Sequence, residues 1–149
     1  MLILVFNAGS SSLKFGVFQV GHDAEEVLRG TFERFRAGRC DFRFRHGATD
    51  EAGTADCGDV GKAVEDVPAV LQRFGLTALD AVGHRVAHGG AKFQAAAVLD
   101  DAVVKSIETL MPLAPLPRWT LTIWRSASGC PISSAARSAT YLWDVPWKP

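Results

Sequence analysis

The sequence has few cysteines, no long apolar run and no net charge. Its three cysteines, Cys40, Cys57 and Cys130, are odd in number and lack the spacing of metal ligands, which favours reduced thiols over a disulfide framework. No apolar run approaches the ~20 residues of a membrane helix, and the N-terminal apolar run lacks the basic segment and cleavage site of a signal peptide. A net charge of zero gives no basic field for nucleic acid or a membrane surface. We therefore expect a cytoplasmic protein that binds neither nucleic acid nor membranes.

A small-residue turn between two strands dominates the N-terminal part of the chain. The apolar run at residues 2–6 predicts a buried strand, and residues 15–20 predict a second strand that returns antiparallel to it. Between them, Gly9 lets an anion approach the backbone N–H groups, Ser10, Ser11 and Ser12 offer hydroxyl donors, and Lys14 adds a positive charge. The pattern is not a Walker A motif, because Lys14 leads into a strand and not a helix. It indicates a phosphate-binding hairpin, although an ordinary turn would also use small residues.

The periodicity of the rest of the chain predicts further strands and two helices. A helix is expected from Val60 to Phe74, with Gly75 as its stop and Pro68 either kinking it or marking its first turn. A second helix from Val103 to Met111 would be capped by Asp100 or Asp101 and ended by Pro112. The remaining expected segments are strands at 27–35, 40–45 and 79–88, a turn at Gly38, and a loop at 46–58. This order of strands and helices predicts an α/β fold.

Alternation places side chains on opposite faces of two of these strands. Phe42 and Phe44 alternate with Arg43 and Arg45, so we expect the rings on a covered face and the guanidinium groups in solvent. A nucleotide contact of these arginines is the alternative interpretation.

The strand at 79–88 separates a histidine pair from an arginine in the same way. His84 and His88 would share one face about 13 Å apart, too far for one metal ion, so we interpret them as histidines hydrogen-bonded within the fold. Arg85 would point to the other face, where its guanidinium either clamps a carboxylate or phosphate or pairs with a surface carboxylate.

Three ordered motifs resemble those of acetate kinases. Asn7-Ala8-Gly9-Ser10-Ser11-Ser12-Leu13-Lys14-Phe15 is similar to the opening signature of that family, and the segments 82–90 and 112–116 are similar to two later ones. The resemblance implies an α/β domain whose mixed sheet begins with an N-terminal antiparallel hairpin, an incomplete half domain of the ribonuclease-H-like, actin-like ATPase type. Because family members are much longer, residues 1–116 are identified as an N-terminal fragment.

The resemblance also implies a reaction and roles for single residues. The family transfers the γ-phosphoryl group of ATP to acetate, reversibly giving acetyl phosphate, with Mg²⁺ as cofactor and a homodimer as the assembly. Asn7 matches the position associated with magnesium, Lys14 the ATP-contacting lysine, Ser10 and Ser12 the phosphate-loop serines, and Arg85 the arginine that holds the substrate carboxylate. The catalytic aspartate has no counterpart here. We therefore expect this chain to have no catalytic residue and to be inactive alone, as an acetate kinase fragment or as a non-catalytic phosphate-binding or nucleotide-binding module.

One position inside the second motif departs from the family pattern. Ala87 stands where the family usually has valine, beside the pocket for the acyl methyl group, and a smaller side chain there could admit propionate. A methyl group changes such selectivity by only ~1–3 kcal/mol, so acetate stays the first choice.

Residues 117–149 differ in composition from everything before them. All four tryptophans lie there, and the segment holds 4 basic and 1 acidic residues, against 12 and 15 in residues 1–116. Gly, Ser, Ala and Arg occur there without helical or strand period, so we expect a poorly ordered tail. The resemblance ends in mid-motif at Leu116, which suggests that this tail is translated out of frame.

Overall fold

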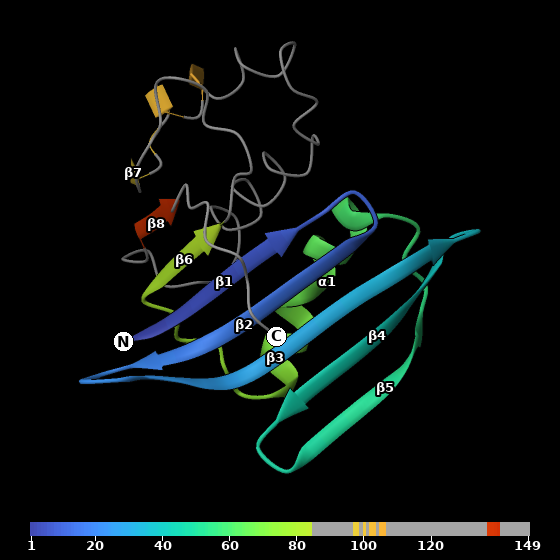
Figure 1. Cartoon of the computed structure of the whole chain (residues 1–149), viewed down its shortest axis with the longest axis horizontal. Helices are drawn as coiled ribbons and strands as arrows, with labels where there is room; N and C mark the ends of the chain where they lie inside the picture. Colours follow the sequence, from blue (N-terminus) through green and yellow to red (C-terminus); the bar gives the residue numbers. More distant parts are fainter. Residues whose placement is uncertain (85–96, 99, 101, 104, 107–136, 141–149) are drawn as a thin grey trace.

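The computed structural model describes residues 1–84, 97–98, 100, 102–103, 105–106 and 137–140 (Figure 1). The described strands form one sheet in the order β5-β4-β3-β2-β1-β6-β8-β7. Their bounds are β1 Leu2–Ala8, β2 Ser12–Val20, β3 Ala24–Arg36, β4 Arg39–His46, β5 Thr49–Ala55, β6 Ala81–His84, β7 Ala97–Val98 and β8 Arg137–Thr140, and the helix α1 spans Val60–Arg73.

The sheet is mixed and is built outward from β1. From β1 to β5 each strand pairs antiparallel with the next one along the chain, whereas β6 returns after α1 to pair parallel with β1. Strand β1 thus has a paired strand at each edge. Its apolar run predicts a strand buried on both faces, but only Leu4 and Phe6 on the helix side are fully buried, and Ile3 and Val5 are half-buried. The expected α/β class with an N-terminal antiparallel hairpin is confirmed.

Helix α1 covers one face of this sheet, behind the strands in the view of Figure 1. It begins where the side chain of Asp59 accepts a hydrogen bond of 2.8 Å from the backbone N–H of Lys62. Its buried residues recur at spacings of three and four, as an amphipathic helix requires: Val60, Ala63, Val64, Val67, Val70 and Leu71. Pro68 lies inside the helix, so its placement in the first turn is wrong. Within the described ranges no helix is long and apolar enough to cross a membrane.

The core between helix and sheet is rich in phenylalanine. Phe15 lies among the rings of Phe6, Phe32 and Phe44, with centroids 6.4, 6.2 and 6.1 Å away. All four rings are at most 4% exposed. As expected, the rings of β4 face the helix side, while Arg43 and Arg45 are exposed on the opposite face. We call this opposite face, which α1 does not cover, the open face.

The expected loop at residues 46–58 is wrong, because most of it forms β5. This strand pairs with β4 along its whole length, from His46 opposite Thr49 to Cys40 opposite Ala55. Its side chains are small, polar and mostly exposed, so no apolar alternation marks it. Backbone pairing at a sheet edge needs no such pattern.

The boundaries of the other predicted elements differ less from those in the structure. Strand β3 begins at Ala24 and ends at Arg36, three residues before and one after the predicted start and end. The turn at Gly38 is confirmed by its φ of +83°, a conformation that favours glycine. Asp100 supplies the cap of the second predicted helix: its Oδ1 accepts a 2.7 Å hydrogen bond from the N–H of Val103. Residues 102–103 and 105–106 are helical, and the remainder of that helix lies outside the described residues.

Candidate phosphate-binding site

The turn between β1 and β2 is closed by the backbone. The N–H of Gly9 donates to the carbonyl of Ser12 at 2.8 Å, so it is used inside the turn and is not a donor for a ligand. A Cβ at Gly9 would come no closer than 3.7 Å to another atom, and the backbone there is not left-handed. The fold therefore does not require glycine at position 9. Close approach of a ligand to the backbone would explain why glycine is present there.

The hairpin register brings three of the predicted site residues to one face. Asn7 on β1 lies directly opposite Lys14 on β2, and Ser12 precedes Lys14 by two residues on the same strand. Leu13 and Phe15, which alternate with them, are buried under α1. Asn7, Ser12 and Lys14 therefore lie on the open face, with the Cα atoms of the opposed pair about 5 Å apart. Ser10 is exposed in the turn beside them.

These side chains are available to a ligand. Lys14 is exposed, Asn7 and Ser12 are half-buried, and in the described part of the chain no side chain hydrogen-bonds or pairs with any of them. An ammonium, an amide and hydroxyl groups beside a tight turn form a suitable donor set for phosphate oxygens. Arg85, the predicted carboxylate clamp, lies outside the described residues, as do Ala87 and His88.

The Asn7 amide oxygen also fits a magnesium ion that is carried by a nucleotide. Magnesium prefers oxygen ligands, keeps several waters and commonly takes only one or two protein ligands beside substrate phosphates. The described residues contain no group of three or more His, Cys, Asp or Glu side chains that could hold a metal ion by themselves. The residues present thus suit a metal bound jointly with phosphate, and not a closed protein site.

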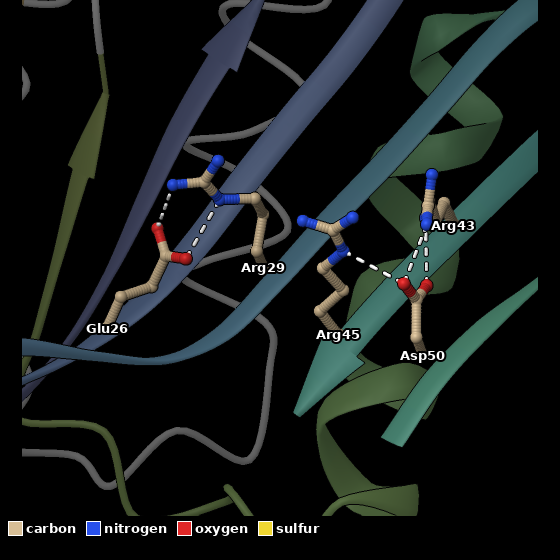
Figure 2. Close-up of polar contacts among 5 residues, drawn as sticks. All are labelled: Glu26, Arg29, Arg43, Arg45 and Asp50. Carbon is tan, nitrogen blue, oxygen red and sulfur yellow. Dashed lines mark hydrogen bonds and ion pairs between the residues drawn. The ribbon is translucent and has the colours of Figure 1, made fainter. Parts of the chain in front are cut away.

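The open face continues as a polar surface beyond the hairpin. Across the sheet, Lys14 is opposite Thr31 on β3, and Thr31 is opposite Arg43 on β4. Figure 2 shows that Arg43 binds Asp50 through two hydrogen bonds, of 2.8 and 2.6 Å. These hydrogen bonds lower the pKa of the Asp50 carboxyl to about 2. The proximity of Thr31 to Lys14 was not predicted, because cross-strand register cannot be read from one strand's sequence.

His84 is a structural histidine in this fold. It lies opposite Phe6 on the helix-facing side of β6 and is 4% exposed. Burial lowers the pKa of its imidazole to about 4, and a hydrogen bond with the backbone of Phe6 opposes that shift. The ring is therefore neutral at neutral pH, which agrees with the interpretation of His84 as part of the core.

The two described cysteines are free and fully buried. Burial raises the pKa of the Cys40 thiol, and burial together with a hydrogen bond that the Cys57 thiol donates to Cys40 raises the pKa of Cys57 to about 12. Thiols with raised pKa values stay protonated and are poor nucleophiles. They belong to the core and not to a reactive site.

Sequence comparison identifies the family. A sequence model of the Acetokinase family matches residues 2–121. The chain belongs to the acetokinase family. It is 38% identical over 119 residues to the acetate kinase of Micrococcus luteus and 40% identical over 121 residues to that of Bacillus subtilis. These alignments cover 78% and 76% of this chain but only 28% and 30% of the two relatives, so the chain spans less than a third of their length.

Solved acetokinase structures share the fold. A propionate kinase from Francisella tularensis and the acetate kinase of Porphyromonas gingivalis each give a TM-score of 0.77 at 22% sequence identity. Each comparison covers 98% of this chain and 41% of the solved chain. The expected incomplete acetate kinase domain is therefore confirmed at the level of the fold.

Proposed function

We propose that this chain is the N-terminal part of an enzyme that phosphorylates acetate with ATP, reversibly forming acetyl phosphate and ADP. The observation that carries the proposal is the pairing of Asn7 with Lys14 across the hairpin that bears the family's opening signature. This pairing sets a cation and an amide oxygen side by side on the open face, next to the serine turn. A hairpin turn without a ligand would not need a lysine and an asparagine side by side next to several serines.

In this proposal the hairpin holds the phosphates of the nucleotide. Lys14 and the hydroxyl groups of Ser10 and Ser12 bind phosphate oxygens, and the amide oxygen of Asn7 is a ligand of magnesium. The magnesium ion would neutralise negative charge that develops on the transferred group. Donors fixed on two paired strands need little reorganisation when that charge develops, which is how such sites accelerate phosphoryl transfer.

Arg85 completes the proposed substrate contacts. Its planar guanidinium can bind both oxygens of the acetate carboxylate, which a lysine cannot do. Propionate is a second candidate substrate, because Ala87 replaces the valine expected beside the acyl group and one of the similar solved structures is a propionate kinase. We also propose that the full-length enzyme is a cytoplasmic homodimer.

We further propose that this chain alone is inactive, because it spans less than a third of its relatives and lacks a counterpart of the catalytic aspartate. The test titrates MgATP into the purified chain by calorimetry and traps acetyl phosphate as its hydroxamate. Lys14→Ala should abolish ATP binding, while Lys62→Ala, which removes an exposed lysine on the helix, should preserve it. Loss of ATP binding in both variants would show that ATP is attracted by positive charge in general and not by a site at Lys14. Acetyl phosphate above the Lys14→Ala level would contradict inactivity.

Residues 117–149 form a separate proposal, that they are translated out of frame. The family match ends at residue 121, close to the change in composition. The nucleotide sequence tests the idea. The proposal predicts that the gene carries a single-base insertion or deletion near codon 116, followed in another reading frame by the rest of the kinase. An absence of any downstream kinase frame would show that the tail is native sequence.

A further inference from the structure

Strand β5 forms one edge of the sheet, and its outer side faces no other strand of the described residues. It stands at the end of the sheet order and pairs only with β4, along its whole length and without a bulge. In Figure 1 it is the outermost strand, on the side of β4 away from β3. Sheet edges are commonly protected by lysine, proline or a bulge, and β5 has none of these. The edge is therefore open to another strand.

The two acidic side chains of β5 are already paired within the chain. Asp50, on the open face, accepts hydrogen bonds from Arg43 and from Arg45 (Figure 2). Glu51 points to the helix side and binds Arg73. The other five residues of β5 are small and uncharged. The charges of β5 are thus offset before a second strand approaches.

The turn before β5 determines which of its residues direct their backbone groups outward. The loop between β4 and β5 has two residues, and only the first, Gly47, is left-handed, with a φ of +55°; this is the type II′ pattern. The residues that close such a turn, here His46 and Thr49, form a hydrogen-bonded pair. From this pair the ladder alternates, so every second residue of β5 turns its N–H and C=O groups away from β4. Those residues are Asp50, Ala52 and Thr54.

We propose that β5 pairs antiparallel with β5 of a second copy of this chain, about a two-fold axis at Ala52. In this register Asp50 lies opposite Thr54 of the partner subunit, so outward N–H and C=O groups meet and no like charges are opposed. Arg39 donates to the hydroxyl of Thr54 at 2.8 Å, which brings its guanidinium beside Asp50 of the partner subunit. A two-fold contact of this kind is closed, so assembly stops at a dimer.

The charge pattern of β5 favours this register over its neighbours. Ala52 is the central residue of the seven, so only an axis there pairs the whole strand with itself. An axis at Asp50 or Glu51 would oppose two identical carboxylates directly, which destabilises a sheet. An axis at Gly53 would set Asp50 opposite Asp56 of the partner subunit, and a further shift shortens the ladder. Because β5 is complementary to itself in length and charge, a second copy fits it better than an unrelated peptide.

Sedimentation of the whole chain from about 10 µM to about 1 mM tests the pairing, because so short an interface should give a weak dimer. Ala52→Lys sets two lysines opposite each other and should raise the dimer dissociation constant at least about threefold. The matched control is Ala48→Lys, the same change at an exposed turn residue outside the pairing, which should change it less than about twofold. No nucleotide enters the test, so its outcome does not depend on the proposed kinase function.

Ala52→Pro provides a second variant. It removes an N–H that points away from β4, so the chain should stay folded by circular dichroism while the dissociation constant rises at least about tenfold. Amide hydrogen exchange of the unchanged chain locates the contact. The amides of Asp50, Ala52 and Thr54 should exchange more slowly at the high protein concentration than at the low one.

A chain that stays monomeric over the whole concentration range would overturn the proposal. So would a dimer that Ala52→Lys and Ala48→Lys weaken equally, since that result would indicate a response to net charge alone. A dimer that tolerates Ala52→Pro, or whose β5 amides exchange at the same rate at both concentrations, would lie on another surface of the molecule.

Discussion

Replacing Gly30 with alanine should destabilise the sheet, because the ring of Phe15 lies where the new methyl group would go. Phe15 is the cross-strand partner of Gly30, and its ring crosses over the glycine. An alanine Cβ at this position would lie 2.1 and 2.2 Å from two ring carbons, distances that real Cβ atoms essentially never show. The ring must therefore move.

The size of the effect follows from how little room the ring has. Phe15 is 2% exposed and has three phenylalanine rings around it, so it cannot shift without displacing them. Overpacking of this kind costs about 1–3 kcal/mol, whereas alanine in place of a strand glycine would otherwise gain about 0.5–1 kcal/mol. We expect a net loss of about 1–2 kcal/mol, which lowers the melting temperature of a small domain by roughly 4–8 °C per kcal/mol.

Urea unfolding of Gly30→Ala followed by circular dichroism measures this loss. Gly21→Ala is the matched control, because no atom lies within 4 Å of a Cβ built there and its backbone is not left-handed. The control should be neutral or slightly stabilising. Combining Gly30→Ala with Phe15→Leu should give a loss smaller than the sum of the two single losses, since the clash is absent without the ring. An unchanged or higher stability of Gly30→Ala would refute the argument.

Three further predictions concern titrating and capping groups. The folded pKa of His84, about 4, lies below the ordinary value near 6.5, so the unfolded state binds more protons between these pH values. The free energy of unfolding should therefore fall by about 3 kcal/mol as the pH drops from 6.5 to 4. Urea unfolding across this pH range should show a smaller loss for His84→Leu than for the unchanged chain. Asp59→Ala removes the cap of α1 and should lower the free energy of unfolding by about 1 kcal/mol. The control Asp56→Ala, at an exposed position before the helix, should change it by less than about 0.5 kcal/mol in the same urea assay. The Asp50 carboxyl should titrate near its pKa of about 2 by NMR, and Arg43→Gln should raise that pKa toward 3.8; an unchanged midpoint would contradict the ion pair. Since that pKa is lowered, stability from this pair is present above pH 3.8 and lost as the pH falls toward 2.

Local patterns in the sequence were enough to predict most elements and the candidate hairpin. The helix α1 was readable because its apolar residues recur at helical spacing and Gly75 follows it. Strand β4 was readable from the alternation of phenylalanine and arginine. The hairpin motif named Asn7, Ser10, Ser12 and Lys14 as candidates, because small residues, hydroxyls and a lysine together suit a phosphate.

Only the tertiary structure decided which of these residues meet. Strand β5 escaped prediction because an exposed edge strand is held by backbone hydrogen bonds to β4, which leave no trace in its side chains. The meeting of Asn7 with Lys14, of Phe15 with Gly30 and of Arg29 with Arg45 depends on strand register. Register is set jointly by two segments distant in sequence, and a shift of one residue would move every side chain to the other face. For that reason the sequence determined the kinds of chemistry that this chain carries, and the paired strands determined where each kind lies.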